Sequence, residues 1–134
     1  MASVAKDSAI ARQLMTIPGF GLICAAEIAG EIGTIERFQK EASLAVYLGM
    51  ANLDHSSGKS RRSKRPKHVN VHAKAAMRLA IDTHRKLCPQ SKRYYEKKRA
   101  DGKKYNQAIR ALGRHLCPVI FKMLKQDRPY RIEP

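Results

Sequence analysis

Acidic residues are scarce in this sequence. The 134 residues contain 11 Asp and Glu against 27 Lys and Arg, which gives a formal net charge of +16. Such an excess repels itself and destabilises a compact chain unless an anionic partner neutralises it. Nucleic acid is the first candidate partner and an anionic membrane surface is the second. The hydrophobic share of 43% excludes a wholly disordered basic tail.

Long apolar runs and cysteine pairs are also missing. No stretch approaches the roughly 20 apolar residues that cross a bilayer, and the polar N-terminus has no signal peptide. Cys24, Cys88 and Cys117 are far apart and form no CxxC pair. They are typical of small buried residues in a reduced protein. We therefore expect a cytoplasmic chain without a membrane partner.

Metal-binding patterns are incomplete as well. The acidic residues are scattered, among them Glu27, Glu31, Glu36 and Asp82, and no pair is spaced to chelate magnesium. Two pairs stand four residues apart, His68 with His72 and His84 with Cys88. Each lacks the second half of a known zinc module. We interpret them as surface histidines and one core cysteine, and we expect no metal or cofactor in this chain.

Helical periodicity runs through most of the chain and predicts one all-α domain over residues 1–134. The expected helices are 3–16, 22–32, 41–48, 70–87, 89–102 and 103–125, with a short turn at 34–38. Proline and glycine mark several of their ends, as at Pro18, Gly33 and Pro89. Pro118 should kink or split the last helix. The tail after it should be frayed.

Residues 7–33 have the pattern of a helix-hairpin-helix. The turn Ile17–Gly21 reads hydrophobic–Pro–Gly–hydrophobic–Gly between two helices with apolar faces. Glycine lets the backbone approach a ligand closely, and amides at the start of a helix bind anions. The pattern predicts phosphate binding at Pro18, Gly19, Phe20 and Gly21. The alternative is a plain Pro-Gly turn.

Residues 50–67 form a long basic loop that precedes a C-terminal helical hairpin, residues 70–126. Six of the nine residues from 59 to 67 are Lys or Arg, so this segment attracts phosphate in a salt-dependent way. The predicted DNA contacts are Gly58, Lys59, Arg61, Arg62, Lys64, Arg65 and Lys67. The alternatives are a solvated loop or a localisation-like basic run.

Ser57 lies in this loop beside Asp54 and His55. Residues adjacent in sequence rarely converge in the geometry of a catalytic triad, although the clustered cations could stabilise charge during phosphoryl transfer. The residues alone favour an ordinary loop serine.

Tyr94 and Tyr95 stand among lysines and arginines in the basic stretch 92–104. Aromatic rings in such surroundings can stack on unpaired bases. Core packing for one tyrosine and solvent for the other is the favoured reading.

An ordered series of motifs resembles one protein family. The series is Ile17–Gly21, Ala29–Gly33 with Ile35, Arg37 and Phe38, Ala45–Met50, Ser57–Lys59, Lys67, Asn70, Tyr94–Tyr95 and Met123–Leu124. Its order and spacing are similar to the C-terminal domain of the bridge-RNA-guided transposases of insertion-sequence family 110 (with 116 and 902), related to the Piv and MooV recombinases. The resemblance covers most of the chain.

The resemblance implies DNA strand cleavage and joining with Ser57 as the nucleophile on a phosphodiester, or Ser56 if the loop shifts by one. It adds Asn70 to the DNA contacts. It also implies a guide RNA, an oligomer, and magnesium held by a ribonuclease-H-like domain that is absent from this sequence. Ser63 and Val69 depart from glycines usual in the family. The alternative function is a non-catalytic module that binds duplex DNA or structured RNA.

Overall fold

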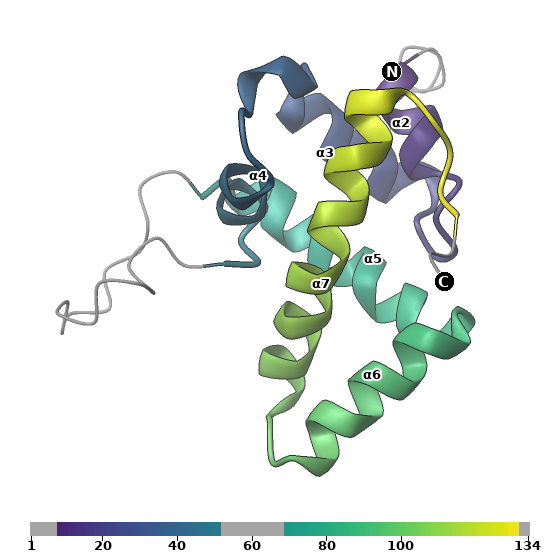
Figure 1. Cartoon of the computed structure of the whole chain (residues 1–134), viewed down its shortest axis with the longest axis vertical. Coiled ribbons are helices and arrows are strands. Elements are labelled where there is room, and N and C mark those ends of the chain that lie inside the picture. Colours follow the sequence, from purple (N-terminus) through teal and green to yellow (C-terminus); the bar gives the residue numbers. More distant parts are fainter. Residues whose placement is uncertain (1–7, 52–68, 132–134) are drawn as a thin grey trace, which may run out of the picture.

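The computed structural model describes residues 8–51 and 69–131, which form helices and turns without a strand (Figure 1). The elements are α2 (Ala9–Leu14), α3 (Leu22–Ile32), the 3-10 helix η1 (Ile35–Arg37), α4 (Glu41–Tyr47), α5 (Val71–Leu87), α6 (Pro89–Ala100) and α7 (Tyr105–Gln126). The all-α prediction is confirmed.

Most helix ends lie where the sequence placed them. Pro89 is in the first turn of α6, and Gly33 ends α3 with a φ of 74°. The first described helix begins at Ala9, after its N-cap Ser8, and ends at Leu14, two residues before the expected end. The Ser8 hydroxyl oxygen accepts a hydrogen bond from the Ala11 amide at 3.2 Å. This bond satisfies one of the free amides at the start of α2.

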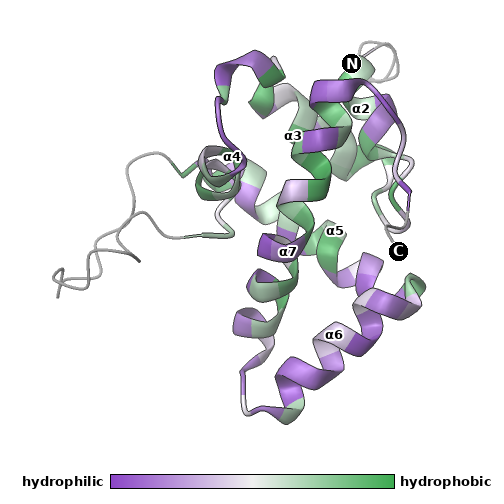
Figure 2. Cartoon of the chain, viewed as in Figure 1, coloured by the Kyte–Doolittle hydropathy of each residue, from purple (hydrophilic) through white to green (hydrophobic). Residues whose placement is uncertain are grey.

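The core lies where α3, α5 and α7 meet. Its largest fully buried side chains include Ile28 and Ile32 of α3, Met77 and Ile81 of α5, and Ile109, Leu112 and Ile120 of α7. Helix α4 packs on α7, and α6 packs on both α5 and α7. Figure 2 shows α6 as mostly hydrophilic, in contrast to α3. Among the helices of the described residues, none is both long enough and apolar enough to cross a membrane.

The predicted split of the last helix at Pro118 is wrong. Helix α7 continues through Pro118 from Tyr105 to Gln126. Proline removes one backbone hydrogen bond from a helix interior, but Cys117 and Ile120 on either side are fully buried. Packing of these neighbours holds the helical path despite the lost bond.

The tail is not frayed between Asp127 and Arg131, so that expectation is wrong for these residues. The Asp127 carboxylate accepts a hydrogen bond from the Gln13 amide group at 2.9 Å. The Tyr130 backbone amide donates to the Thr16 hydroxyl oxygen at 2.8 Å. Both bonds join the tail to residues more than a hundred positions earlier, a connection without any local sequence signal.

Candidate nucleic-acid interface

The turn between α2 and α3 packs against the C-terminal part of α5. Gly19 has a φ of +92°, and a Cβ atom added to it would lie 2.5 Å from the backbone nitrogen of His84. Glycine is therefore required at position 19 by backbone conformation and by close packing on α5. This requirement is independent of any bound phosphate.

His84 joins this turn to α6. It is fully buried, its Nδ1 lies 2.7 Å from the Pro18 carbonyl oxygen, and its Nε2 lies 2.8 Å from the Ser91 hydroxyl. A carbonyl only accepts, so Nδ1 carries the proton and Nε2 accepts from Ser91. Burial lowers the pKa of His84, which favours this neutral form. The interpretation of His84 as a surface histidine is wrong.

The turn offers only part of itself to solvent. The Phe20 side chain is 3% exposed and packs edge-on against His84, with ring centroids 6.3 Å apart. Gly21, the N-cap of α3, is exposed, and a Cβ atom there would meet nothing within 4 Å. The open face of the turn is therefore at Gly21 and the first amides of α3.

The segment 52–68 leaves and re-enters the described structure at one place, the C-terminal end of α4. The Met50 amide donates to the Ala45 carbonyl oxygen at 2.9 Å, and the Asn70 amide donates to the Tyr47 carbonyl oxygen at 3.0 Å. The Arg114 guanidinium of α7 donates to the Met50 carbonyl oxygen at 3.2 Å. Both ends of the basic segment are thus anchored in the helical body.

Asn70 connects helices α3, α4 and α5 through both polar atoms of its side chain. Its Oδ1 accepts from the Ala73 amide at 2.9 Å and caps α5. Its Nδ2 donates to the Glu31 carboxylate at 2.7 Å and to the Tyr47 hydroxyl oxygen at 3.0 Å. Asn70 therefore has a structural role, and the prediction that it contacts DNA stays a prediction.

The structure places two of the predicted contacts, Gly19 and Asn70, at opposite ends of α5. Gly19 before α3 meets the C-terminal part of α5, whereas Glu31 near the end of α3 meets Asn70 at the start of α5. The two helices are therefore antiparallel, and the two regions are separated by the length of α3. That helix has 11 residues, or about 16 Å at ~1.5 Å per residue.

The predicted loop contacts and nucleophile lie outside the described residues. They are Ser57 and Ser56, with Gly58, Lys59, Arg61, Arg62, Lys64, Arg65 and Lys67. Among residues 8–51 and 69–131, no group of three His, Cys, Asp or Glu side chains is placed to hold a metal ion.

One of the two tyrosines of α6 lies in the core, as predicted, but the other is half-buried and not in solvent as expected. Tyr95 is 8% exposed and belongs to the core. Tyr94 is half-buried and stacks on His115 of α7, with centroids 4.9 Å apart and planes 20° apart. Helix α6 carries five Lys or Arg and a single acid in its 12 residues. It presents positive charge beside this pair of rings.

The three cysteine thiols are free, and two of them, Cys24 and Cys117, are poorly suited to chemistry at neutral pH. Complete burial raises the pKa of Cys117 to about 12, and burial also raises the pKa of Cys24. A thiol with a raised pKa forms little thiolate, which is the nucleophilic form. Cys117 and Cys88 are buried, as expected of core cysteines, whereas Cys24 is only half-buried.

Comparison with known proteins gives consistent matches. Residues 11–96 match the family described as Transposase IS116/IS110/IS902 family. An insertion element IS110 uncharacterized 43.6 kDa protein of Streptomyces coelicolor is 35% identical over 118 residues, 87% of this chain and 29% of the relative. An IS900 uncharacterized 42 kDa protein of Mycobacterium paratuberculosis is 33% identical over 119 residues, 87% of this chain and 30% of the relative.

A similar protein from Coxiella burnetii bears the name transposase for insertion sequence element IS1111A. It is 26% identical over 133 residues, which are 96% of this chain and 36% of that protein. The chain thus spans about a third of the length of these relatives. Because the family match covers more than half of the sequence, the chain belongs to the IS116/IS110/IS902 transposase family.

Proposed function

We propose that this chain is the DNA-binding and strand-joining part of an insertion-sequence transposase, with Ser57 as the nucleophile and Ser56 as the alternative. The observation that carries the proposal is the family match, because residues 11–96 include the whole basic segment and both serines. The hydrogen bonds that fix Met50 and Asn70 to the helices also support the proposal, since reactive groups need a rigid support.

In the proposed reaction, the Ser57 hydroxyl oxygen attacks the phosphorus of a DNA phosphodiester. A new oxygen–phosphorus bond forms, the bond to one deoxyribose oxygen breaks, and the serine proton is lost as the leaving hydroxyl gains one. The negative charge of the transition state needs nearby cations, a role we assign to Lys59, Arg61 and Arg62. We assign any magnesium to a ribonuclease-H-like domain rather than to the described residues.

The proposed duplex contacts have two parts. The exposed Gly21 and the first amides of α3 face solvent at the positive end of an 11-residue helix, which favours a phosphate. The basic segment supplies a second, stronger electrostatic contact. Gly21 and Asn70 lie at opposite ends of α3, so we propose that the two parts touch different phosphates of one duplex. A guide RNA and a homo-oligomer also remain proposals for the complete protein.

Serine replacement in a complete transposase that contains this chain tests the chemistry. S57A should abolish strand joining and the covalent protein–DNA adduct, whereas S56A should leave both within about threefold, roughly 0.6 kcal/mol of activation free energy. DNA binding by both variants is the control for folding. Joining that survives S57A and disappears with S56A would move the nucleophile by one residue. Joining that survives both would leave a non-catalytic binding module.

A further inference from the structure

A cavity of about 460 Å³ lies between the start of α6, the middle of α7 and the tail. The side chains that matter for its chemistry are Ser91, Arg93, Tyr94, His115, Tyr130 and Arg131. The volume is within the range of ~300–1,000 Å³ that small-molecule sites occupy. We call this cavity the α6–α7 pocket.

One wall of the α6–α7 pocket is a pair of stacked rings. Tyr94 and His115 lie nearly parallel, with centroids 4.9 Å apart, and His115 is exposed on the outer side of α7. Two stacked rings with an exposed member form a platform on which a third planar ring can stack. Leu112 and Leu116 of α7 give the pocket an apolar floor.

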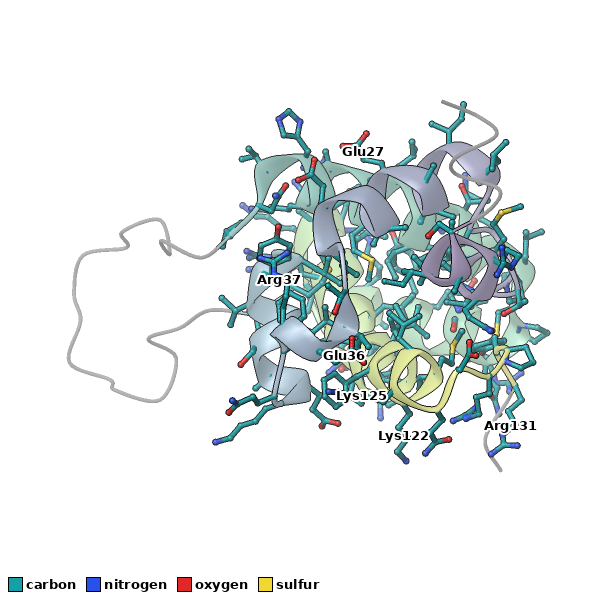
Figure 3. All side chains as sticks on the ribbon, turned by 90° about the horizontal axis from the view of Figure 1, so that it is seen from above. Glu27, Glu36, Arg37, Lys122, Lys125 and Arg131 are labelled. Atoms are coloured by element: carbon teal, nitrogen blue, oxygen red, sulfur yellow. The ribbon has the colours of Figure 1, made fainter. Side chains whose placement is uncertain are left out.

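Positive charge surrounds this platform. Arg93 and Arg131 line the pocket, and none of the described lining residues is acidic. The Lys98 ammonium lies 5.3 Å from the centroid of the Tyr94 ring. Figure 3 shows Lys122 and Arg131 projecting from the same side of the molecule. The surroundings therefore favour a ligand with an aromatic ring and a negative group.

The opposite wall is preformed by contacts away from the pocket. Ser91 donates to buried His84 at 2.8 Å, and the Tyr130 amide donates to Thr16 at 2.8 Å. The Tyr130 ring packs edge-on against His84, with centroids 6.2 Å apart. A wall that is already ordered loses little entropy when a ligand binds.

We propose that the α6–α7 pocket binds one unpaired nucleotide of single-stranded nucleic acid, with the base stacked beside His115 and Tyr94 and its phosphate near Arg93 and Arg131. This site is distinct from the proposed duplex contacts at Gly21 and the basic segment. Paired bases within a duplex are already stacked on both faces, so the platform selects unpaired ones. An acidic peptide would use the arginines without using the rings.

The pocket and Asn70, which follows the basic segment, lie at opposite ends of α5. The basic segment re-enters at Asn70, before α5, and the pocket begins at Gln90, after α5. Helix α5 has 17 residues, which corresponds to about 25 Å. The proposed nucleotide site and the described residue that follows the basic segment are therefore separated by the length of α5.

Fluorescence anisotropy with the 134-residue chain tests this proposal. At one ionic strength, the chain is titrated with a labelled oligothymidylate, an oligouridylate, an abasic oligonucleotide of the same length and charge, and a duplex. Stacking of one base should make oligothymidylate or oligouridylate bind about tenfold tighter than the abasic strand. The tighter of the two identifies DNA or RNA as the source of the nucleotide.

Matched variants locate the preference. H115A removes an exposed ring and should reduce the preference for bases over abasic strand to near onefold, and Y94L should do the same. H72A replaces another exposed histidine and should leave the preference unchanged. R93Q should weaken base-containing and abasic strands by equal factors, while K40Q, on α4's exposed side, should change neither by more than about twofold.

Several results would overturn the pocket. They are equal affinity for abasic and base-containing strands, an unchanged preference in H115A, or an equal loss for duplex and single strand in H115A. The duplex titration separates this proposal from the proposed function. Duplex binding without base preference would reject the nucleotide site and leave the proposed duplex contacts standing. Base preference without duplex binding would reject the duplex contacts and leave the nucleotide site standing.

Discussion

The two ends of α5 are built from different kinds of contact. At the C-terminal end, Gly19 packs directly against the helix backbone, and fully buried His84 joins the turn to α6. At the N-terminal end, half-buried Asn70 links α3, α4 and α5 through side-chain hydrogen bonds. Sequence patterns associated both ends with DNA, yet each end also holds the fold together. A substitution there must therefore be tested for stability before any loss of binding is interpreted.

The two glycines of the turn show this difference within one motif. Gly19 has positive φ and no room for a side chain, whereas a Cβ atom at Gly21 would meet nothing within 4 Å. Gly21 also has a φ of −79°, which other residues adopt freely. The first glycine serves the fold, and the second is available to a ligand.

The largest expected effect is that of G19A. The alanine would combine a positive φ with a methyl group 2.5 Å from the His84 backbone nitrogen. We expect the free energy of unfolding to fall by about 3 kcal/mol or more. Urea denaturation followed by circular dichroism measures the loss. The matched variant G21A should lose about 1 kcal/mol or less. Equal stability of G19A and G21A would contradict the packing account.

N70A should cost less, because it removes hydrogen bonds without creating a clash. Loss of the α5 cap and of the bonds to Glu31 and Tyr47 should lower the free energy of unfolding by about 1–2 kcal/mol. The same denaturation experiment applies. N106A, at an exposed position of α7, is the control and should change stability by about 0.5 kcal/mol or less. An N70A variant as stable as N106A would show that the junction of α3, α4 and α5 does not depend on Asn70.

The smallest effect is the pH dependence that comes from His84. Burial lowers the pKa of His84 below the 6.5 that is usual for histidine, so the unfolded chain takes up a proton at a higher pH than the folded chain. Stability should be full above pH ~6.5, fall as the pH decreases below it by at most about 1.4 kcal/mol per unit, and level off below the folded-state pKa.

H84Q is the comparison for this titration. Glutamine does not titrate, so the stability of H84Q between pH ~6.5 and ~5 should be flatter than that of the original chain. Identical slopes for the two proteins would show that another group is responsible.

Much of the fold follows from local signals in the sequence. Pro18, Gly33 and Pro89 mark helix ends, and Asn70 precedes the helix that it caps. Such signals act within a few residues, so they are readable without a structure. Pro118 misled for the opposite reason. The cost of the lost backbone hydrogen bond is outweighed by the burial of Cys117 and Ile120 against other helices. A single sequence does not reveal this packing.

The site was less predictable because its contacts are distant in sequence. His84 meets Pro18 across 66 positions, and Tyr130 meets Thr16 across 114. His84 was interpreted as a surface histidine because its partners, Pro18 and Ser91, could not be inferred from the sequence. The sequence did not show which of Tyr94 and Tyr95 would be the less buried, and nothing in it placed His115 beside Tyr94.

The most direct test of the central claim, that this transposase-family chain binds DNA through its positive surface, is a salt series. The affinity of the chain for a generic duplex is measured by fluorescence anisotropy at increasing salt concentration. We predict tight binding at low salt and a log–log slope of several units, with about −0.9 for each neutralised phosphate. Weak binding at low salt, or an affinity that does not change with salt, would contradict the claim.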